Sequence, residues 1–262
     1  MSEPTSQTTP QEVGYGISGA TATITLDIPA TRNALSTSVL AQLRRRLAEA
    51  VADDAVRVVV VSHTGPVFSS GMDLRTVVDV PAQDQPVMAF PVLLTDMVTA
   101  PKPVIARVGG KARAGGIGLL AACDIAVGAS DADFAFTEVR LGLIPASISL
   151  PVLRRISEQA ARRLFLTGET FDAQQAASIG LLDRVVAPDT LDEEVRTVAT
   201  SLTEGGPGAL AAIKRLLADP PTGTLAERYH TLAALSARHF ASPEGQEGTA
   251  ARREKRRPNW AP

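Results

Sequence analysis

The chain has 262 residues, of which 45% are hydrophobic and 21% are charged, so it is long enough to bury a sizeable core. Its formal net charge of -2 gives no reason to expect a nucleic acid or an anionic membrane as a partner, and no apolar run reaches the ~18–20 residues that span a bilayer. The single cysteine, Cys123, forms no internal disulfide and favours a reducing, cytoplasmic setting. The three histidines follow no metal-ligand spacing, so we expect no metal site.

The first half of the chain alternates predicted strands with predicted helices, after a polar lead-in at residues 1–12 that is expected to be disordered. The expected strands are a hairpin at 13–28, a β-branched run at 57–61, the proline-bounded segment 101–109, residues 124–130 and the start of 134–145. The expected helices are 36–52 with Ser36 as its cap, 87–99 disturbed by Pro91, and one that begins near Gly115. Residues 62–74 show no period and are expected to form a loop.

From Ser149 onward, helical patterns follow one another and are interrupted by a lone strand predicted at 182–187. These helical patterns lie at 149–166, 172–179, 189–204, 207–218, 223–241 and 243–256. We therefore expect an α/β core over residues 13–200, followed by a helical C-terminal region over residues 201–262.

Two glycine-containing loops each follow a predicted buried strand and precede a helix: FSSGMDL at 68–74 and ARAGGIGLL at 112–120. Sites in α/β sheets gather beyond the carboxyl ends of the strands, where helix N-termini offer unpaired backbone N–H groups. Glycine lets a ligand approach the backbone, so the two loops could aim two N–H donors at one oxygen. Ordinary turns and tight helix packing remain the alternative, and neither phosphate-loop pattern is present.

These segments resemble motifs of the crotonase (enoyl-CoA hydratase/isomerase) superfamily. FSSGMDL is similar to its F-S-x-G-x-D-L loop, and the stretch from PKPVIA to AACD is similar to its P-K-P-V-I-A-x-V-x-G-x-x-x-G-G-G-x-x-L-A-x-x-C-D segment. The likeness continues through FTEVRLGLIP, FLTGETFDAQQAASIGLLDRVV and EGTAARREKRRPNW, over roughly residues 14–260. It implies a spiral of ββα units with a helical C-terminal region that assembles trimers or hexamers. It also implies an acyl-CoA thioester as the substrate, with no separate cofactor.

The resemblance also implies the catalytic groups. The backbone N–H groups of Met72 and Gly115 would form an oxyanion hole for the thioester oxygen, and Glu138 would be the general acid/base. The family's hydratases generally use a second glutamate three residues past the donor glycine. That position is Gly118 here, so the first carboxylate is missing.

Further residues are assigned to substrate or coenzyme A by the same resemblance. They are Arg32, Ala34, Ser70, Asp73, Leu74 and Lys255, the last reaching coenzyme A on a neighbouring subunit. Residues 75–90 are expected to line the acyl pocket. Arg113 and Arg140 lie near the two key loops and could favour an anionic acyl group, or they could be ordinary surface charges.

A single carboxylate leaves three functions open. The first is reversible hydration of a 2-enoyl-CoA through a stabilised enolate, the second is Δ3,Δ2-enoyl-CoA isomerisation, and the third is acyl-CoA binding without catalysis. The stretch TEVRLGLIPASISLPVL is similar to enzymes acting on branched or glutaconyl-type substrates, which favours hydration narrowly. The usual straight-chain enzymes have I-P-G-x-G-G where this chain reads IPASIS, at 144–149, which argues against an ordinary short-chain substrate.

Overall fold

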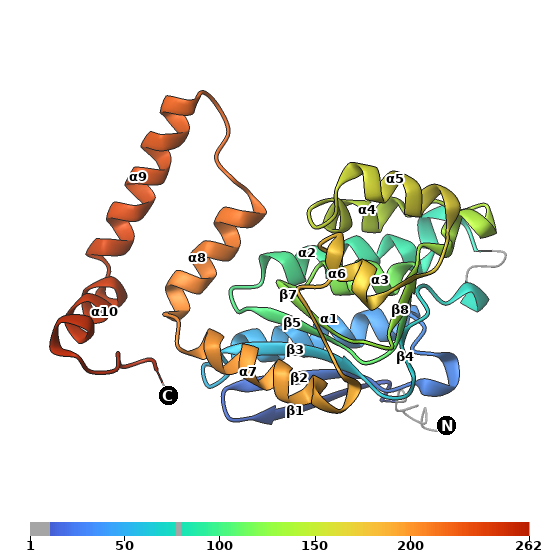
Figure 1. Ribbon diagram of the computed structural model, residues 1–262, viewed down its shortest axis with the longest axis horizontal. Helices are drawn as coiled ribbons and strands as arrows, with labels where there is room; N and C mark the ends of the chain where they lie inside the picture. Colours follow the sequence, from blue (N-terminus) through green and yellow to red (C-terminus); the bar gives the residue numbers. More distant parts are fainter. Residues whose placement is uncertain (1–10, 77–79, 262) are drawn as a thin grey trace, which may run out of the picture.

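Two β-sheets, surrounded by helices, make up the body of the molecule (Figure 1). The structure is a computed structural model that describes residues 11–76 and 80–261, so most of the predicted lead-in lies outside the described residues. The larger sheet has the strand order β1-β2-β3-β5-β7-β10, and the smaller has the order β4-β6-β8-β9. Only β1 of the larger sheet and β9 of the smaller one pair antiparallel with their neighbours.

The first half of the chain repeats a unit of two strands and a helix, as the resemblance implies. From the second unit on, each places one strand in each sheet. The units are β1 (Val13–Ser18), β2 (Thr21–Leu26) and α1 (Thr37–Ala52); β3 (Val58–His63), β4 (Val67–Ser69) and α2 (Phe90–Thr99); β5 (Val104–Val108), β6 (Lys111–Arg113) and α3 (Gly115–Ala121); β7 (Ile125–Ala129), β8 (Asp133–Ala135) and α4 (Ala146–Leu153).

The second half is mainly helical, as predicted, but contains two strands where one was expected. Its elements are α5 (Glu158–Thr167), β9 (Phe171–Asp172), α6 (Ala173–Ser178), β10 (Arg184–Val186), α7 (Leu191–Thr203), α8 (Pro207–Ala218), α9 (Leu225–Ala241) and α10 (Pro243–Glu254). The predicted helix over 149–166 is wrong, because two helices occupy that range. Ser157 caps the second, its side chain accepting the amide hydrogen of Ala160.

Two other predictions are corrected by local geometry. Pro91 does not disturb a helix: it occupies the first turn of α2, where its missing N–H is not needed. The segment 62–74 is not wholly a loop, because β3 extends to His63 and β4 follows it. At three residues, β4 is too short to show a period in the sequence.

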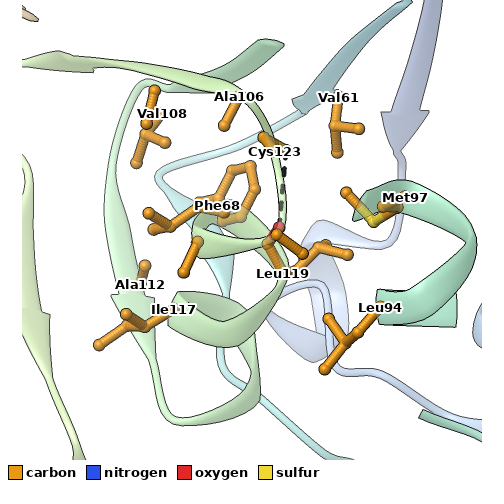
Figure 2. Close-up of a cluster of buried hydrophobic side chains, with 14 of the residues drawn as sticks. Val61, Phe68, Leu94, Met97, Ala106, Val108, Ala112, Ile117, Leu119 and Cys123 are labelled. Atoms are coloured by element: carbon orange, nitrogen blue, oxygen red, sulfur yellow. Dashed lines mark hydrogen bonds between the residues drawn. The ribbon is translucent and has the colours of Figure 1, made fainter. Parts of the chain in front are cut away.

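Strand β3 is buried on both faces, as its β-branched run predicts. Val59 and Val61 belong to the main core, whereas Val58 and Val60 pack in a second cluster with α7. Figure 2 shows the part of the main core around α3, where side chains of α2, α3 and several strands meet. This packing fixes the position of α3, the helix that begins at the predicted donor Gly115.

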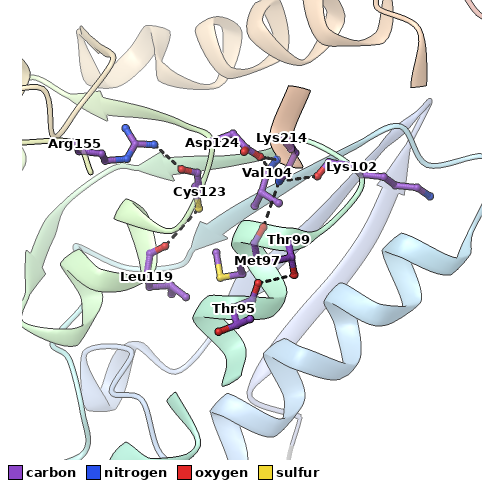
Figure 3. Close-up of polar contacts among 10 residues, drawn as sticks. All are labelled: Thr95, Met97, Thr99, Lys102, Val104, Leu119, Cys123, Asp124, Arg155 and Lys214. Atoms are coloured by element: carbon purple, nitrogen blue, oxygen red, sulfur yellow. Dashed lines mark hydrogen bonds and ion pairs between the residues drawn. The ribbon is translucent and has the colours of Figure 1, made fainter. Parts of the chain in front are cut away.

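Buried polar contacts attach the C-terminal helices to this body (Figure 3). Lys214 of α8 is only 7% exposed and donates to the Asp124 carboxylate and to the carbonyls of Met97 and Lys102. Arg155, just after α4, donates to the carbonyls of Ala121 and Cys123 at the end of α3. These contacts hold α8 against α2, and α4 against α3.

Helices α9 and α10, which follow α8, form an arm that extends away from the sheets (Figure 1). Helix α9 contains no buried residue, and its side chains Leu225, Tyr229 and Phe240 are largely exposed. No helix in the described part of the chain has the length and apolar content to cross a membrane.

Candidate active site

A cavity of about 610 Å³ brings together the three predicted catalytic positions, Met72, Gly115 and Glu138. Its walls come from the β4–α2 segment, the start of α3, and the segment from η5 (Thr137–Leu141) to α4. Most of its lining side chains are apolar. The lining residues are Ser70, Met72, Leu74, Gln85, Val87, Phe90, Ala114, Gly115, Thr137, Glu138, Leu141, Leu143, Ile144, Pro145, Ala146, Ser147 and Ile148.

The two loops that carry the predicted N–H donors touch each other. A Cβ built on Gly71 would lie 3.0 Å from the amide nitrogen of Gly115, and one on Gly115 would lie 3.4 Å from that of Met72. Gly71 has a φ of +86°, so glycine serves both the backbone conformation and the close approach. Neither the Met72 nor the Gly115 amide has a hydrogen-bond acceptor among the described residues. Both donors are therefore available to a ligand in the cavity.

Main-chain bonds on either side of Met72 fix its peptide. The amide of Leu35 donates to the carbonyl of Gly71 at 2.8 Å, and the amide of Asp73 donates to the carbonyl of Leu35 at 3.2 Å. Gly115 is the first residue of α3, where an amide has no partner within the helix. The predicted strand-to-helix geometry is therefore present in the second glycine loop, which runs from β6 into α3. The first loop differs, because it begins in β4 and is followed by the short 3₁₀-helix η2 (Leu74–Thr76), not by an α-helix.

Two fully buried polar residues, Asn33 and Ser69, hold the Met72 loop in place. The Ser69 hydroxyl donates to the carbonyl of Asn33 at 2.8 Å and accepts the amide hydrogen of Gly71 at 3.2 Å. The side-chain amide of Asn33 donates to the carbonyls of Thr64 and Val67, and its Oδ1 accepts the amide hydrogen of Ile28. This network joins the predicted coenzyme A segment to the loop of the predicted Met72 donor. Neither Asn33 nor Ser69 was predicted from the sequence as part of the site.

Ser69 also touches the second glycine loop. A Cβ on Gly116 would lie 2.7 Å from the Ser69 carbonyl oxygen, so only glycine fits there. Ala114, which immediately precedes Gly115, has a φ of 47°, a conformation that non-glycine residues rarely adopt. The family pattern has glycine at position 114, so this chain retains backbone strain beside the donor.

Glu138 lies in η5, directly after β8, and lines the cavity. Its Oε2 atom is buried and has no hydrogen-bond partner among the described residues. Burial raises the pKa of the Glu138 carboxyl above its ordinary value, and a hydrogen bond from its own backbone opposes this more weakly. A carboxyl with a raised pKa and an unpartnered oxygen in an apolar cavity can both accept and return a proton.

The space beside Gly118 is filled by another side chain. A Cβ on Gly118 would lie 2.1 Å from Cγ2 and 2.7 Å from Cβ of Ile148. Ile148 comes from α4, is 3% exposed and lines the cavity. The missing first carboxylate has therefore been replaced by apolar packing and has not simply left an opening.

The remaining predicted ligand contacts divide into two groups. Ser70 and Leu74 line the cavity, as do Gln85, Val87 and Phe90 from the expected acyl segment 75–90, of which 77–79 lie outside the described residues. Arg32 and Ala34 lie in the loop next to the donor: the Ser70 amide donates to the Arg32 carbonyl at 2.9 Å.

Asp73 and Lys255 do not lie at the cavity. Asp73 is 6% exposed, and its carboxylate binds the Arg75 guanidinium at 2.7 and 2.9 Å, which lowers the pKa of Asp73. Its position predicts a role in loop structure more than a contact with substrate. Lys255 is the C-cap residue of α10, on the extended arm, and is not among the residues that line the cavity.

The two arginines suggested for an anionic acyl group are also absent from the cavity lining. Arg113 instead donates to the carboxylate and the carbonyl of Asp133. Cys123 is buried, and burial raises the pKa of its thiol to about 12, which favours a packing role over a nucleophilic one.

A second hollow, of about 730 Å³, lies between the larger sheet and α7. It contains His63, which is 7% exposed and accepts the amide hydrogen of Gly109 at Nε2 (2.9 Å). Asp192, also in this hollow, is paired with Arg107. Because His63, Arg107 and Asp192 of this hollow already have hydrogen-bond partners, the 610 Å³ cavity is the better candidate active site.

Known proteins resemble this chain along nearly its full length. A family model described as Enoyl-CoA hydratase/isomerase matches residues 16–262. The human enoyl-CoA hydratase domain-containing protein 3, named as mitochondrial, is 32% identical over 241 residues, which cover 91% of this chain and 80% of the relative. The crystal structure of an enoyl-CoA hydratase from Mycobacterium smegmatis has a TM-score of 0.89 at 31% identity and covers 95% of this chain and 98% of its own. AtuE of Pseudomonas aeruginosa has a TM-score of 0.89 at 33% identity, with 96% of this chain and 100% of its own covered.

Proposed function

The chain belongs to the enoyl-CoA hydratase/isomerase family, and we propose that it is an enzyme in which Glu138 moves a proton along an enoyl-CoA thioester. The carbonyl oxygen of that thioester binds the backbone N–H groups of Met72 and Gly115. The reaction that the geometry favours is Δ3,Δ2-enoyl-CoA isomerisation. The observations that carry this choice are that Glu138 is the one acidic side chain among the described lining residues, with no partner there for its Oε2 atom, and that Ile148 fills the space beside Gly118.

The proposed reaction needs one base and no water. The Glu138 carboxylate takes a proton from C2 of a 3-enoyl thioester, and the electron pair moves onto the carbonyl oxygen. The two N–H donors stabilise the resulting dienolate, and loss of one such donor typically costs about 2.7–4 kcal/mol of barrier. Glu138 then returns its proton to C4, and the double bond moves to C2–C3.

The cavity favours an uncharged, apolar acyl group. Leu143, Ile144 and Phe90 are among its lining side chains, and the described lining residues include no lysine or arginine. An acyl group that ends in a carboxylate would find no positive partner there, which argues against the glutaconyl-type substrate suggested by the sequence.

Hydration of a 2-enoyl-CoA is the second candidate, because the Mycobacterium smegmatis relative is named an enoyl-CoA hydratase and the human relative an enoyl-CoA hydratase domain-containing protein. Two hydroxyl groups, those of Thr137 and Ser147, also line the cavity and could hold a water near Glu138. A non-catalytic acyl-CoA-binding protein of the same fold is the third candidate. The buried Glu138 carboxyl, whose pKa is raised, argues against this third candidate.

The rest of the proposal concerns coenzyme A, assembly and location. Coenzyme A lies along the Arg32–Ala34 loop, and Lys255 of a neighbouring copy completes its site in a homotrimer or hexamer. The exposed, apolar side chains of α9 support this assembly, since a 17-residue helix without buried residues needs a partner surface. A cytoplasmic location agrees with the single, buried cysteine.

Product analysis tests the proposal. The wild type and the variants Glu138→Gln and Glu193→Gln are incubated with 3-enoyl-CoA and 2-enoyl-CoA, and the products are identified by mass and double-bond position. Isomerisation leaves the mass unchanged, whereas hydration adds one water. We expect wild-type isomerisation, a ~10²–10⁴-fold lower turnover for Glu138→Gln, and no change for the exposed control Glu193→Gln. Unchanged turnover in Glu138→Gln would exclude Glu138 as the acid/base.

A further inference from the structure

Two departures from the family pattern, far apart in sequence, meet inside the molecule. Gly118 stands where the hydratases generally have their first glutamate, and Ile148 stands at the fifth position of IPASIS, where the straight-chain enzymes have glycine. A Cβ at 118 and the side chain at 148 would occupy the same space, 2.1 Å apart. Compared with the family pattern, α3 therefore lacks a carboxylate side chain at position 118, and α4 carries a branched alkyl side chain at position 148 in the same space.

We propose that Ile148 is a specificity-determining residue that keeps water away from the reacting carbons. The enolate is then reprotonated by Glu138, and the 2-enoyl product leaves without being hydrated. This inference rests on the proposed isomerisation and adds the residue that separates it from hydration.

The position of Ile148 suits this role. It lines the same cavity as Met72, Gly115 and Glu138, so it borders the space in which the acyl carbons lie. At 3% exposure, its alkyl group is packed and offers no hydrogen-bonding group to a water. A water on the Ile148 side of the cavity meets only an alkyl group, so it finds no polar partner on that side.

Contacts made by the residues that follow Ile148 hold it in place. Val152, one turn later, is fully buried in the main core. Arg155 then binds the end of α3 through the carbonyls of Ala121 and Cys123, with an Nε to Ala121 oxygen distance of 3.1 Å. Helix α3 also carries Gly115 and Gly118. The Ile148 side chain and the loop of the Gly115 donor therefore belong to one packed unit.

The reaction that the Ile148 side chain would prevent is the addition of water. A 2-enoyl thioester takes up water by forming a C3–O bond and a C2–H bond, which gives a 3-hydroxyacyl thioester. The hydroxyl group on C3 and the new hydrogen on C2 both come from one water molecule, so no other reactant is needed. If Ile148 excludes that water, the only proton available to the dienolate is the one that Glu138 holds.

The first experiment replaces Ile148 by Ala and measures the partition of products from 3-enoyl-CoA. We expect the ratio of 3-hydroxyacyl-CoA to 2-enoyl-CoA to rise at least ~10-fold over wild type. In D₂O, the deuterium content at C4 of the isomerised product should rise as well, because the proton on Glu138 can exchange with the admitted solvent. The matched control is Val152→Ala, which removes buried alkyl groups from the same helix but does not border the cavity, and it should keep the wild-type ratio.

A second, activity-independent experiment measures packing. Gly118→Ala should lower the free energy of unfolding measured in urea. In a protein that already carries Ile148→Gly, the same substitution should lower it much less, because both Cγ2 and Cβ of Ile148 are then absent. Additive effects would show that the two positions do not compete for space and would overturn the proposal.

The outcomes separate the two levels of inference. A wild type that does not convert 3-enoyl-CoA contradicts the proposed function and the role of Ile148 with it. A wild type that isomerises, together with a folded Ile148→Ala variant of unchanged product ratio and deuterium content, overturns the role of Ile148 alone. A folded Ile148→Val variant, which keeps Cγ2 but is smaller, should give an intermediate ratio.

Discussion

At the scale of single residues, Glu138 differs from the other acidic groups near the site. Asp73 and Asp133 are each bound by an arginine, whereas Glu138 Oε2 is buried without a hydrogen-bond partner in the described part of the chain. An unpartnered buried carboxyl reduces stability and is retained where a reaction needs its proton. The carboxyl was predicted from sequence as the acid/base, but its lack of a partner depends on side chains from other elements and could not be predicted.

The raised pKa of Glu138 predicts how stability and activity depend on pH. Between the ordinary value of 4.5 and the raised folded-state value, the folded protein holds a proton that the unfolded chain has released. The free energy of unfolding contributed by this group therefore falls as pH rises through that window. Urea unfolding should show that Glu138→Gln gains stability relative to wild type at pH 8 but not at pH 4.

The same ionisation should appear in the kinetics. Because the carboxylate is the base, kcat/KM should rise with pH along a limb whose pKa lies above that of an ordinary glutamate. A stability difference between wild type and Glu138→Gln that is equal at both pH values, with a limb at the ordinary pKa, would contradict the raised value.

At the scale of elements, the site is assembled from loops whose positions depend on buried polar contacts. Asn33 and Ser69 connect the Arg32–Ala34 loop with β4 and with the Gly71 amide, which immediately precedes Met72. The N–H donor is a main-chain group, so its direction is set by these contacts and not by the side chain at position 72. Such positioning matters because an oxyanion donor acts only when it is aimed in advance at the developing charge.

Ser69→Ala tests this positioning. The variant leaves the Gly71 amide without its acceptor, an effect of about 1–3 kcal/mol for a buried group. We expect kcat to fall by ~10-fold or more with a smaller change in KM, since the Met72 donor acts mainly in the transition state. Ser178→Ala removes an exposed hydroxyl that donates to the Gln175 carbonyl at 2.8 Å and serves as the control. Equal effects of the two substitutions on kcat would exclude the positioning role.

Some helices and strands could be predicted from the sequence, and others could not. The long buried strands and the helices α1, α2 and α3 were predicted, because periodicity and caps are local signals. The strands β4, β6, β8 and β9 have only two or three residues each, so the second sheet arises from tertiary pairing. The contact of Gly118 with Ile148 spans two helices, and only the fold brings those residues together.

At the scale of the whole molecule, the C-terminal arm is the part that a single chain leaves without a partner surface. Helix α9 packs against α10 but has no buried residue, and Phe240 is 72% exposed. A helix of this length without tertiary packing is only marginally stable in water. The arm therefore fits a protein that assembles with further copies of itself.

The mass in solution tests the assembly. Light scattering should give a multiple of the chain mass, with three or six copies, and the double variant Tyr229→Glu/Phe240→Glu should shift it towards the monomer. Gln159→Glu/Gln174→Glu adds the same charge at exposed positions of α5 and α6 and should leave the mass unchanged. A monomeric wild type with a stable, helical arm would contradict this prediction.

The most direct test of the central claim observes the thioester carbonyl itself. An acyl-CoA labelled with ¹³C at the carbonyl is bound to the Glu138→Gln variant, and its C=O stretching frequency is measured by difference infrared spectroscopy. Two donors from Met72 and Gly115 should polarise the bond and move the band to a lower frequency than that of the same thioester in water. A bound carbonyl whose band stays at the frequency in water, or moves higher, would contradict the oxyanion hole on which the proposed enzyme depends.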